Sequence, residues 1–270
     1  MLQSLVTTNW LNDTLDHPDL VILYTTLIPK KKSISVDVEN LQIRGAQFFD
    51  LQTVFSDQHS GLPNTFPSEK QFELGCQKLG ISNRSKIVVY DSLGIYSSPR
   101  VWFLFKSMGH PKVSVLDGGL TAWLASGFET EQKREAKVEQ SNFSACLKSD
   151  LLIDKKQVQK GIDTKDSVIL DARSGARFNG EVLEPRKELR SGHLPNSFNL
   201  HYATLLENGK YKSKEELEQL FKPYKNQKEL IFSCGSGITA CILLLAASEI
   251  IPSKLLLYDG SWTEWESSAI

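Results

Sequence analysis

The chain has 270 residues, which is long enough for two domains of ordinary size. Hydrophobic residues make up 40% of the sequence and charged residues 23%, as in a typical globular protein. Because 31 Lys and Arg residues face 32 Asp and Glu residues, the formal net charge is only −1, and nothing indicates a nucleic acid or an anionic membrane as a partner.

No targeting or membrane-spanning segment is predicted. The stretch from Met1 to Thr8 lacks a basic region followed by an apolar run, so it does not resemble a secretory signal. The longest apolar run, from Ile238 to Ala247, is too short to cross a bilayer. The four cysteines show no pairing pattern and fit a reducing compartment, so we expect a cytoplasmic protein.

Three segments of the first half recur in the same order in the second half. In each half the first of them predicts a short amphipathic helix followed by an apolar strand. The matching pairs are Leu5–Leu23 with Leu152–Leu170, Ile87–Asp91 with Leu230–Cys234, and Leu116–Trp123 with Tyr258–Trp265. One such match could arise by chance, but three in the same order indicate an internal repeat.

Apolar strands alternate with helical stretches in both halves of the chain. This pattern predicts an α/β fold with two tandem domains, each a parallel sheet flanked by helices. A polar, charged stretch between the halves is typical of a linker. We therefore expect a first domain over residues 1–136, a linker over 137–150 and a second domain over 151–270.

The two halves differ at the last residue of their second matching segment. Asp91 stands in the first half where the second half has Cys234. The first-half loop, Asp91 to Arg100, contains no thiol. The first domain is therefore predicted to be catalytically inactive.

Two arginines follow another strand of the second half. The strand Val168–Leu170 is followed by a polar segment that contains Arg177 and Arg186. Because the carboxyl ends of parallel strands form the ligand-binding edge of an α/β sheet, both arginines could converge on the loop that carries Cys234. The residues alone favour the alternative of surface arginines paired with Glu181, Glu184 or Glu188.

The segment Leu230–Ser248 has the pattern of a buried strand, a tight turn and a buried helix. Two glycines in the turn Cys234-Gly-Ser-Gly-Ile238 permit backbone angles closed to other residues, so successive N–H groups can point into one small bowl. The bowl lies at a helix N-terminus, where unpaired N–H groups and the helix dipole favour negative charge. Cys234 at its mouth is therefore predicted to be a nucleophile.

Each cysteine also has a structural interpretation. A buried core position is common for free cysteines, but a Gly-rich turn makes it the weaker alternative for Cys234. Cys241 lies within the apolar helix and is interpreted as packing. Cys76 and Cys146 have no Cys or His nearby at metal-ligand spacing, so no metal site is predicted.

The loop lacks the features of two other enzyme classes that use a reactive cysteine. Tyrosine phosphatases and arsenate reductases place an Arg six residues after the cysteine to grip an oxyanion, whereas this chain has Ala240 there. No Cys-x-x-Cys is present, which argues against a thioredoxin-type dithiol. The loop is instead suited to a neutral or monoanionic group carried on sulfur, such as a persulfide.

The sequence Cys234-Gly-Ser-Gly-Ile-Thr-Ala240 resembles the active-site loop of the 3-mercaptopyruvate sulfurtransferases, two-domain members of the rhodanese family that usually have Val in place of Ile238. The segments Asp91–Trp102 and His110–Trp123 resemble the first domain of these enzymes, so the resemblance covers most of the chain. It implies two tandem rhodanese-like domains. It also implies sulfur transfer from a small donor to an acceptor through a persulfide on Cys234.

The resemblance also assigns roles to residues outside the cysteine itself. Arg177 and Arg186 match the family's Arg-Phe and Glu-Pro-Arg motifs, which hold the carboxylate and ketone of the donor. Tyr96 matches a tyrosine that reaches toward the substrate from the first domain, and packing at the domain interface is an equal alternative.

Within the loop, the resemblance assigns the stabilisation of sulfur to the backbone. The N–H groups of Gly235, Gly237, Ile238 and Thr239 are expected to stabilise the thiolate and then the persulfide. Ser236 or a water is expected to protonate the enolate that leaves.

One family feature is missing from this chain. Mercaptopyruvate enzymes commonly carry His-Met-Leu-Pro in the first domain, and that His is proposed to act with the loop serine in a proton relay. The aligned residues here are Asn64-Thr-Phe-Pro67, so we expect no such relay through this position.

The expected donor is 3-mercaptopyruvate and the expected acceptor a thiol, a thioredoxin or cyanide, with no metal or organic cofactor. Two alternatives remain open, namely thiosulfate as the donor and a non-catalytic rhodanese-like binding module. Cys234 and both arginines are present, which counts against the module. Gly235 and Ser236 stand where thiosulfate enzymes carry two basic residues, which favours mercaptopyruvate over the compact thiosulfate dianion.

Overall fold

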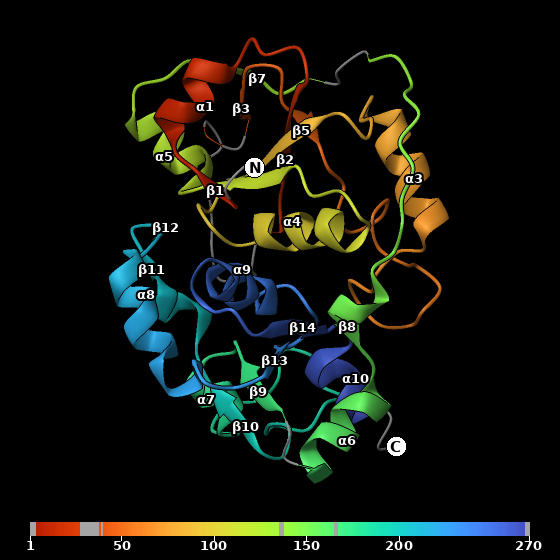
Figure 1. Cartoon of the computed structure of the whole chain (residues 1–270), viewed down its shortest axis with the longest axis vertical. Coiled ribbons are helices and arrows are strands. Elements are labelled where there is room, and N and C mark those ends of the chain that lie inside the picture. Colours follow the sequence, from red (N-terminus) through yellow and green to blue (C-terminus); the bar gives the residue numbers. More distant parts are fainter. Residues whose placement is uncertain (1–3, 28–37, 39, 135–137, 165–166, 268–270) are drawn as a thin grey trace. The chain divides into compact units, whose positions relative to one another are not determined.

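A computed structural model describes residues 4–27, 38, 40–134, 138–164 and 167–267 (Figure 1). The contacts of the chain divide it into two compact units. The first comprises Met1–Asp57, Phe66–Leu147 and Asn208–Tyr211, and the second comprises Gln58–Thr65, Lys148–Glu207 and Lys212–Ile270. None of the described helices is both long enough and apolar enough to span a membrane.

The first unit is built on a five-stranded parallel sheet. In their order across the sheet, its strands are β1 (Leu5–Val6), β6 (Val113–Leu116), β5 (Lys86–Asp91), β2 (Leu20–Thr25) and β4 (Gln47–Phe48). Its described helices are α1 (Thr8–Thr14), α3 (Glu69–Lys78), α4 (Ser98–Ser107) and α5 (Gly119–Ala125). An antiparallel ribbon pairs β3 (Leu41–Ile43) with β7 (Thr130–Gln132).

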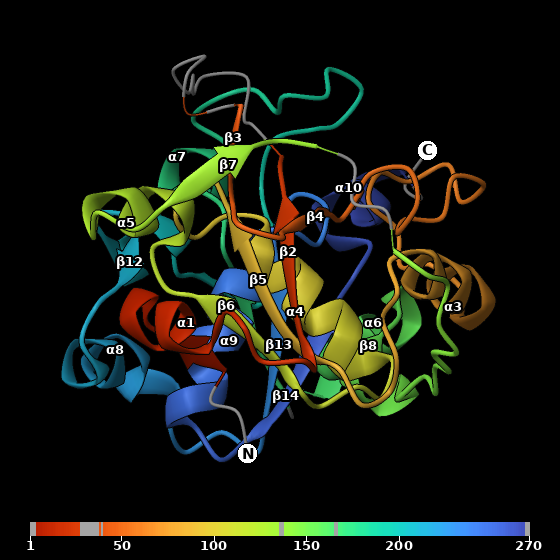
Figure 2. The ribbon, with the colours of Figure 1, turned by 90° about the horizontal axis from the view of Figure 1, so that it is seen from above.

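Helices cover both faces of this sheet (Figure 1, Figure 2). Val88 and Tyr90 of β5 point into a core that α1 and α5 close with Leu11 and Trp123. On the other face α4 packs along β5 and β6. Because both faces are covered, the central strand β5 is almost entirely apolar, as parallel strands usually are.

The second unit repeats this plan. In their order across the sheet, its strands are β8 (Leu152–Ile153), β14 (Lys254–Tyr258), β13 (Glu229–Ser233), β9 (Val168–Asp171) and β10 (Ser197–Asn199). Its α-helices are α6 (Lys155–Thr164), α7 (Gly175–Phe178), α8 (Lys214–Phe221), α9 (Ala240–Ile250) and α10 (Ser261–Ser267). Short 3₁₀ helices lie at Ser149–Leu151, Tyr202–Leu205 and Lys222–Tyr224, and β11 (Leu206–Glu207) pairs with β12 (Lys210–Tyr211).

The core of the second unit again lies on both faces of its sheet. Ile231 of β13 packs in one layer with Val158 and Ile162 of α6 and Trp262 of α10. On the other face α9 packs along β13 and β14, and every residue from Ala240 to Ala247 is buried. A helix that is apolar on all sides requires such complete cover.

The strand registers of the two sheets coincide with the sequence repeat. Each pairing in the first sheet has its counterpart in the second at the repeat-related residues. Val21 pairs with Ile87 as Val168 pairs with Leu230, and Val6 pairs with Leu116 as Ile153 pairs with Tyr258. The prediction of two α/β domains with parallel sheets flanked by helices is therefore confirmed.

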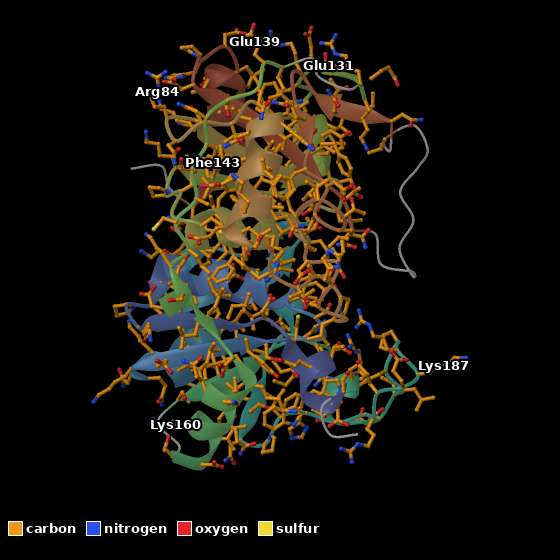
Figure 3. All side chains as sticks on the ribbon, turned by 90° about the vertical axis from the view of Figure 1, so that its right-hand side faces the viewer. Arg84, Glu131, Glu139, Phe143, Lys160 and Lys187 are labelled. Atoms are coloured by element: carbon orange, nitrogen blue, oxygen red, sulfur yellow. The ribbon has the colours of Figure 1, made fainter. Side chains whose placement is uncertain are left out.

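The predicted linker, residues 137–150, is described from residue 138 onward. Its Phe143 is fully buried (Figure 3). The ring lies edge-on against Phe72 of the first unit, and backbone hydrogen bonds join Ser141 to Gln77 and Cys146 to Met108. An aromatic side chain and backbone hydrogen bonds thus attach the segment to that unit. The boundaries of the two domains at residues 1–136 and 151–270 stay a prediction.

Asp91 occupies, in the first unit, the place that Cys234 holds in the second. Its buried carboxylate accepts five hydrogen bonds of 2.8–3.0 Å. The donors are the backbone N–H groups of Leu93, Tyr96, Ser97 and Ser98 and the hydroxyl of Ser98. The loop before α4 is therefore folded around an anion that the protein itself supplies.

This arrangement predicts that Asp91 is important for the stability of the first unit. Asp91→Ala should lower the free energy of unfolding of this unit by about 3 kcal/mol, because it leaves buried N–H groups without an acceptor. Hydrogen exchange of peptides from β5 and α4 measures the effect. Asp91→Asn keeps one acceptor oxygen and should cost less, and unchanged exchange in Asp91→Ala would contradict the prediction.

Candidate active site

Cys234 lies directly after β13, the central strand of the second sheet. The turn that follows leads into α9, as the sequence predicts. The side chain is buried, with 2% of its surface exposed, and the backbone carbonyl accepts a hydrogen bond of 3.0 Å from the N–H of Trp262. Burial at the carboxyl edge of the sheet, and not in its interior, agrees with a site that encloses a reactive atom.

The hydroxyl of Ser261 holds the turn in shape. It accepts hydrogen bonds from the N–H groups of Cys234 (3.1 Å) and Gly237 (3.2 Å) and donates to the carbonyl of Tyr258 (2.9 Å). Ser261 has a φ of 50°, in the left-handed region that disfavours side chains. A non-glycine residue in that conformation indicates that the hydroxyl contributes more than the backbone strain costs.

Other N–H groups of the turn remain available to a ligand. In the part of the chain that the structure describes, those of Gly235, Ser236, Ile238 and Thr239 donate to no protein acceptor. The N–H of Gly237 differs from the expectation, because it donates to Ser261 and so shapes the turn. The remaining donors precede α9, whose dipole adds to their attraction for negative charge.

Arg177, on α7, lies beside the Cys234 turn. A Cβ atom at Gly235 would be only 3.0 Å from its Nη2 atom. Its Nε donates to Oε1 of Glu184 (3.0 Å) and its Nη2 to Oε2 of the same carboxylate. Burial lowers the pKa of Arg177, but the hydrogen bonds and charge of Glu184, with a contribution from Cys234, outweigh burial and raise it above its ordinary value.

The pairing with Glu184 and the location beside Cys234 therefore occur together. The sequence left a surface ion pair and a substrate contact as alternatives for Arg177. Glu184 occupies one edge of the guanidinium. Nη1 forms no hydrogen bond or ion pair with any described residue, so this nitrogen is open to a ligand. The ion pair thus holds the arginine in place next to the turn.

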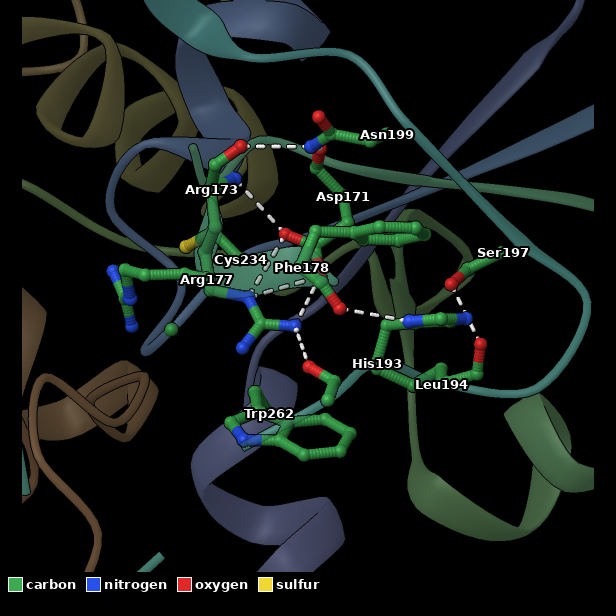
Figure 4. A network of polar contacts seen from close by, with 12 residues as sticks. Asp171, Arg173, Arg177, Phe178, His193, Leu194, Ser197, Asn199, Cys234 and Trp262 are labelled. Atoms are coloured by element: carbon green, nitrogen blue, oxygen red, sulfur yellow. Dashed lines mark hydrogen bonds and ion pairs between the residues drawn. The ribbon is translucent and has the colours of Figure 1, made fainter. Parts of the chain in front are cut away.

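Glu184 is itself held by a buried network. Its Oε1 accepts from Nη1 of Arg173 (3.0 Å). Arg173 also binds both carboxylate oxygens of Asp171 (Figure 4). The guanidinium of Arg173 lies over the ring of Trp262, 4.8 Å from its centroid. The charges of these side chains alternate from Asp171 through Arg173 and Glu184 to Arg177, so they compensate one another, as buried ions require.

Arg186 reaches the same turn by another route. Its Nη1 donates to the hydroxyl of Thr263 (3.2 Å), and that hydroxyl donates to the carbonyl of Gly235 (2.6 Å). Among the described residues it forms no ion pair with a carboxylate. Arg186 is therefore a cation at the site whose charge no acidic side chain offsets.

Ser236 meets a residue from the first half of the sequence. Its Oγ accepts a hydrogen bond of 3.0 Å from Nδ2 of Asn64. The segment Gln58–Thr65 belongs to the second unit by its contacts, so this pair lies within that unit. The residue that replaces the family's histidine is thus in contact with the loop serine.

Tyr96 lies in the first unit, where its N–H donates to Asp91 and its side chain is half-buried. Its role toward a substrate stays a prediction.

The other cysteines have distinct environments. Cys241 is buried in α9 and its Sγ donates to the carbonyl of Gly237 (3.3 Å). Burial raises the pKa of the Cys76 thiol well above its ordinary value. Cys146 is exposed. Within the described ranges no three His, Cys, Asp or Glu side chains are placed to hold a metal ion.

Two residues of the site were missed in the sequence, namely Ser261 and Thr263, whereas Glu184 was named only as a partner of surface arginines. The repeat contains a signal for both missed residues. Ser261 stands where the first half has Gly119, which has nearly the same φ of 53°. Thr263 matches Thr121, whose hydroxyl donates to the carbonyl of Ser92 as that of Thr263 donates to Gly235. A serine in the place of a repeat-related glycine indicates that its hydroxyl forms hydrogen bonds that stabilise the turn.

The geometry of Ser261 yields a prediction about stability. Ser261→Ala should lower the free energy of unfolding by roughly 2–4 kcal/mol, because two buried N–H groups lose their acceptor while the left-handed backbone stays strained. Ser261→Gly loses the same hydrogen bonds but relieves the strain, so it should cost about 1 kcal/mol less. Denaturant unfolding of both variants measures the difference, and equal losses would show that the backbone is unstrained.

Both halves of the chain are similar in sequence to known proteins. The family model for the rhodanese-like domain matches residues 32–126 and 154–268. A thiosulfate/3-mercaptopyruvate sulfurtransferase of Arabidopsis thaliana is 35% identical, with 97% of this chain and 76% of the relative covered. The 3-mercaptopyruvate sulfurtransferase of Escherichia coli K12 is 32% identical, with 97% and 94% covered.

A solved structure gives the same result. The crystal structure of the Escherichia coli 3-mercaptopyruvate sulfotransferase SseA superposes with a TM-score of 0.85 at 32% identity, over 97% of this chain and 99% of that one. Both halves match the family model, and the likeness extends over nearly the whole chain. The chain therefore belongs to the rhodanese family, among its two-domain sulfurtransferases.

Proposed function

We propose that this sulfurtransferase takes a sulfur atom from 3-mercaptopyruvate, carries it as a persulfide on Cys234 and passes it to a thiol. The observation that carries the proposal is the convergence of two arginines on the turn around Cys234. Arg177 lies against Gly235, and Arg186 is linked to the carbonyl of Gly235 through Thr263. A donor whose carboxylate binds these arginines would place its sulfur near Cys234.

The proposed reaction has two steps. In the first, the Cys234 thiolate attacks the donor sulfur, an S–S bond forms, and the C–S bond breaks with its electron pair passing to the carbon of the pyruvate enolate. The enolate takes up one proton and leaves as pyruvate. In the second, an acceptor thiolate attacks the outer sulfur and the thiolate of Cys234 returns. The N–H groups of Gly235, Ile238 and Thr239 would stabilise negative charge on sulfur in both steps.

The turn supports mercaptopyruvate over thiosulfate as the donor. It carries no basic side chain, and at Gly235 Arg177 leaves little room for one, because a Cβ atom there would already lie 3.0 Å from Nη2. A compact dianion such as thiosulfate needs positive charge close to the attacking sulfur. The carboxylate of mercaptopyruvate lies several bonds away from its sulfur, and the two arginines are placed for such a group.

The acceptor and the compartment belong to the same proposal. The thiol acceptor is proposed to be a small thiol or a thioredoxin, with cyanide as an artificial substitute. Four cysteines without a disulfide fit a reducing environment, which supports the cytoplasm as the site of action.

The first experiment identifies the sulfur carrier. After incubation with 3-mercaptopyruvate, mass spectrometry should find one added sulfur atom on Cys234, with one equivalent of pyruvate released. Cys234→Ser should abolish both, because the serine hydroxyl is nearly isosteric but is not a comparable nucleophile. The kcat/KM for mercaptopyruvate should exceed that for thiosulfate by at least about tenfold, equivalent to roughly 1.4 kcal/mol.

The outcomes distinguish the alternatives. Changing Cys76, Cys146 or Cys241 singly should leave turnover largely unaffected. Sulfur found on one of those residues would move the nucleophile. Equal turnover of thiosulfate would make thiosulfate the better-supported donor, and no pyruvate at all would support the binding module.

The arginines generate a separate prediction. Arg177→Ala and Arg186→Ala should each lower kcat/KM for mercaptopyruvate by roughly 2–4 kcal/mol, the range for loss of one member of a charged hydrogen-bonded pair. Steady-state kinetics measures this. Arg190 offers a matched control, because it follows the same strand, β9, and pairs with Glu266 of α10. Arg190→Ala should change kcat/KM little. Unchanged values for both Arg177→Ala and Arg186→Ala would reduce them to surface residues.

A further inference from the structure

We propose that Asn64 is a positioning residue that fixes the hydroxyl of Ser236 as a hydrogen-bond donor to the substrate. The inference rests on the proposed function and adds a residue to its machinery. It starts from the hydrogen bond of 3.0 Å between Nδ2 of Asn64 and Oγ of Ser236. An amide and an imidazole in this position have different consequences for the serine, because the amide cannot exchange a proton near neutral pH.

The segment that carries Asn64 is internally braced. The hydroxyl of Ser60 donates to that of Thr65 (2.7 Å) or to the carbonyl of Leu62 (3.0 Å), while the Thr65 hydroxyl also lies 3.0 Å from that carbonyl. The N–H of Leu62 donates back to the Ser60 hydroxyl (3.1 Å). Asn64 therefore sits in a short loop held by hydrogen bonds in which its own side chain takes no part.

The backbone of Asn64 suits an asparagine. Its φ of 60° lies in the left-handed region, which asparagine tolerates better than most side chains. The same holds for Asn196, with a φ of 57°, whose Nδ2 donates to the carbonyl of Ile162 (3.3 Å). Asn196 provides a second asparagine of the same backbone conformation that has no contact with the Cys234 turn.

The direction of the hydrogen bond decides what Ser236 can do. A hydroxyl has one proton and two lone pairs, so accepting from Asn64 leaves the proton to point elsewhere. In the described chain no protein acceptor takes that proton. Ser236 is thus prepared to donate to a ligand, and the developing enolate oxygen of the donor is the acceptor that the reaction supplies.

The proton that completes pyruvate then comes from water. Asn64 cannot replenish a proton lost by Ser236, so the hydroxyl stabilises the enolate oxygen and keeps its own proton. The enolate carbon is protonated by solvent after the C–S bond has broken. The contribution of the pair is therefore to kcat, through charge that develops as the bond breaks.

Two substitutions at position 64 separate hydrogen-bond direction from side-chain removal. Asn64→Asp keeps the shape of the side chain, but the carboxylate accepts a hydrogen bond from the Ser236 hydroxyl. The hydroxyl then no longer donates to the substrate. We expect kcat for pyruvate release to fall about 100-fold. Asn64→Gly keeps the left-handed backbone and removes the donor, and kcat should fall about tenfold, the value of one lost hydrogen bond, with KM within about twofold.

A double-mutant comparison tests the dependence on Ser236. In a Ser236→Ala background both Asn64 substitutions should lose their effect on kcat. Asn196→Asp, with the same charge change in the same backbone conformation, should leave kcat within about twofold. Circular dichroism and thermal unfolding confirm that each variant is folded.

Other results would overturn the proposal. Full kcat in Asn64→Asp would mean that Ser236 donates to Asn64, and equal losses with and without Ser236 would mean that Asn64 acts through another group. Failure of the unmodified protein to release pyruvate would contradict the proposed function, because mercaptopyruvate would then not be the donor. With thiosulfate as the donor, kcat should not depend on residue 64, because thiosulfate yields no enolate.

Discussion

The position of Cys234 after the central strand of a parallel sheet determines which residues can reach it. β13 lies between β9 and β14, and Ser233 pairs with Asp171 while Phe232 pairs with Leu257. The segments after these neighbouring strands must therefore meet at the Cys234 turn. The segment after β9 supplies the arginine network, and the segment after β14 supplies the hydroxyls. The chemistry of the site follows from which residues these two segments place there.

The sequence was sufficient for the sheets and for the position of Cys234 between a strand and a helix, because both depend on local patterns. The repeat-related registers, such as Val21 with Ile87 and Val168 with Leu230, follow from apolar runs that recur along the chain. The hydrogen bonds of Ser261 were not predicted, because they require a left-handed backbone that few serines adopt. Spacing also could not decide between a carboxylate partner and a place beside the Cys234 turn for Arg177, because the folded chain gives this arginine both.

The two halves show how one loop architecture serves opposite purposes. In the first, the carboxylate of Asp91 satisfies the N–H groups before α4, so stability is gained and the anion site is closed. In the second, Ser261 accepts from the N–H groups of Cys234 and Gly237. Among the described residues no acceptor takes the N–H groups of Gly235, Ser236, Ile238 and Thr239, so this turn carries the cost of unsatisfied donors.

The exchange of short segments between the halves limits how the chain can be divided. Gln58–Thr65 packs with the second unit although it is encoded in the first half, and Asn208–Tyr211 packs with the first although it is encoded in the second. A fragment beginning at Lys148 would carry Cys234 and both arginines yet lack the partner of Ser236. Under the role proposed for Asn64, the complete site takes residues from both repeats, so separating the repeats would remove one of them.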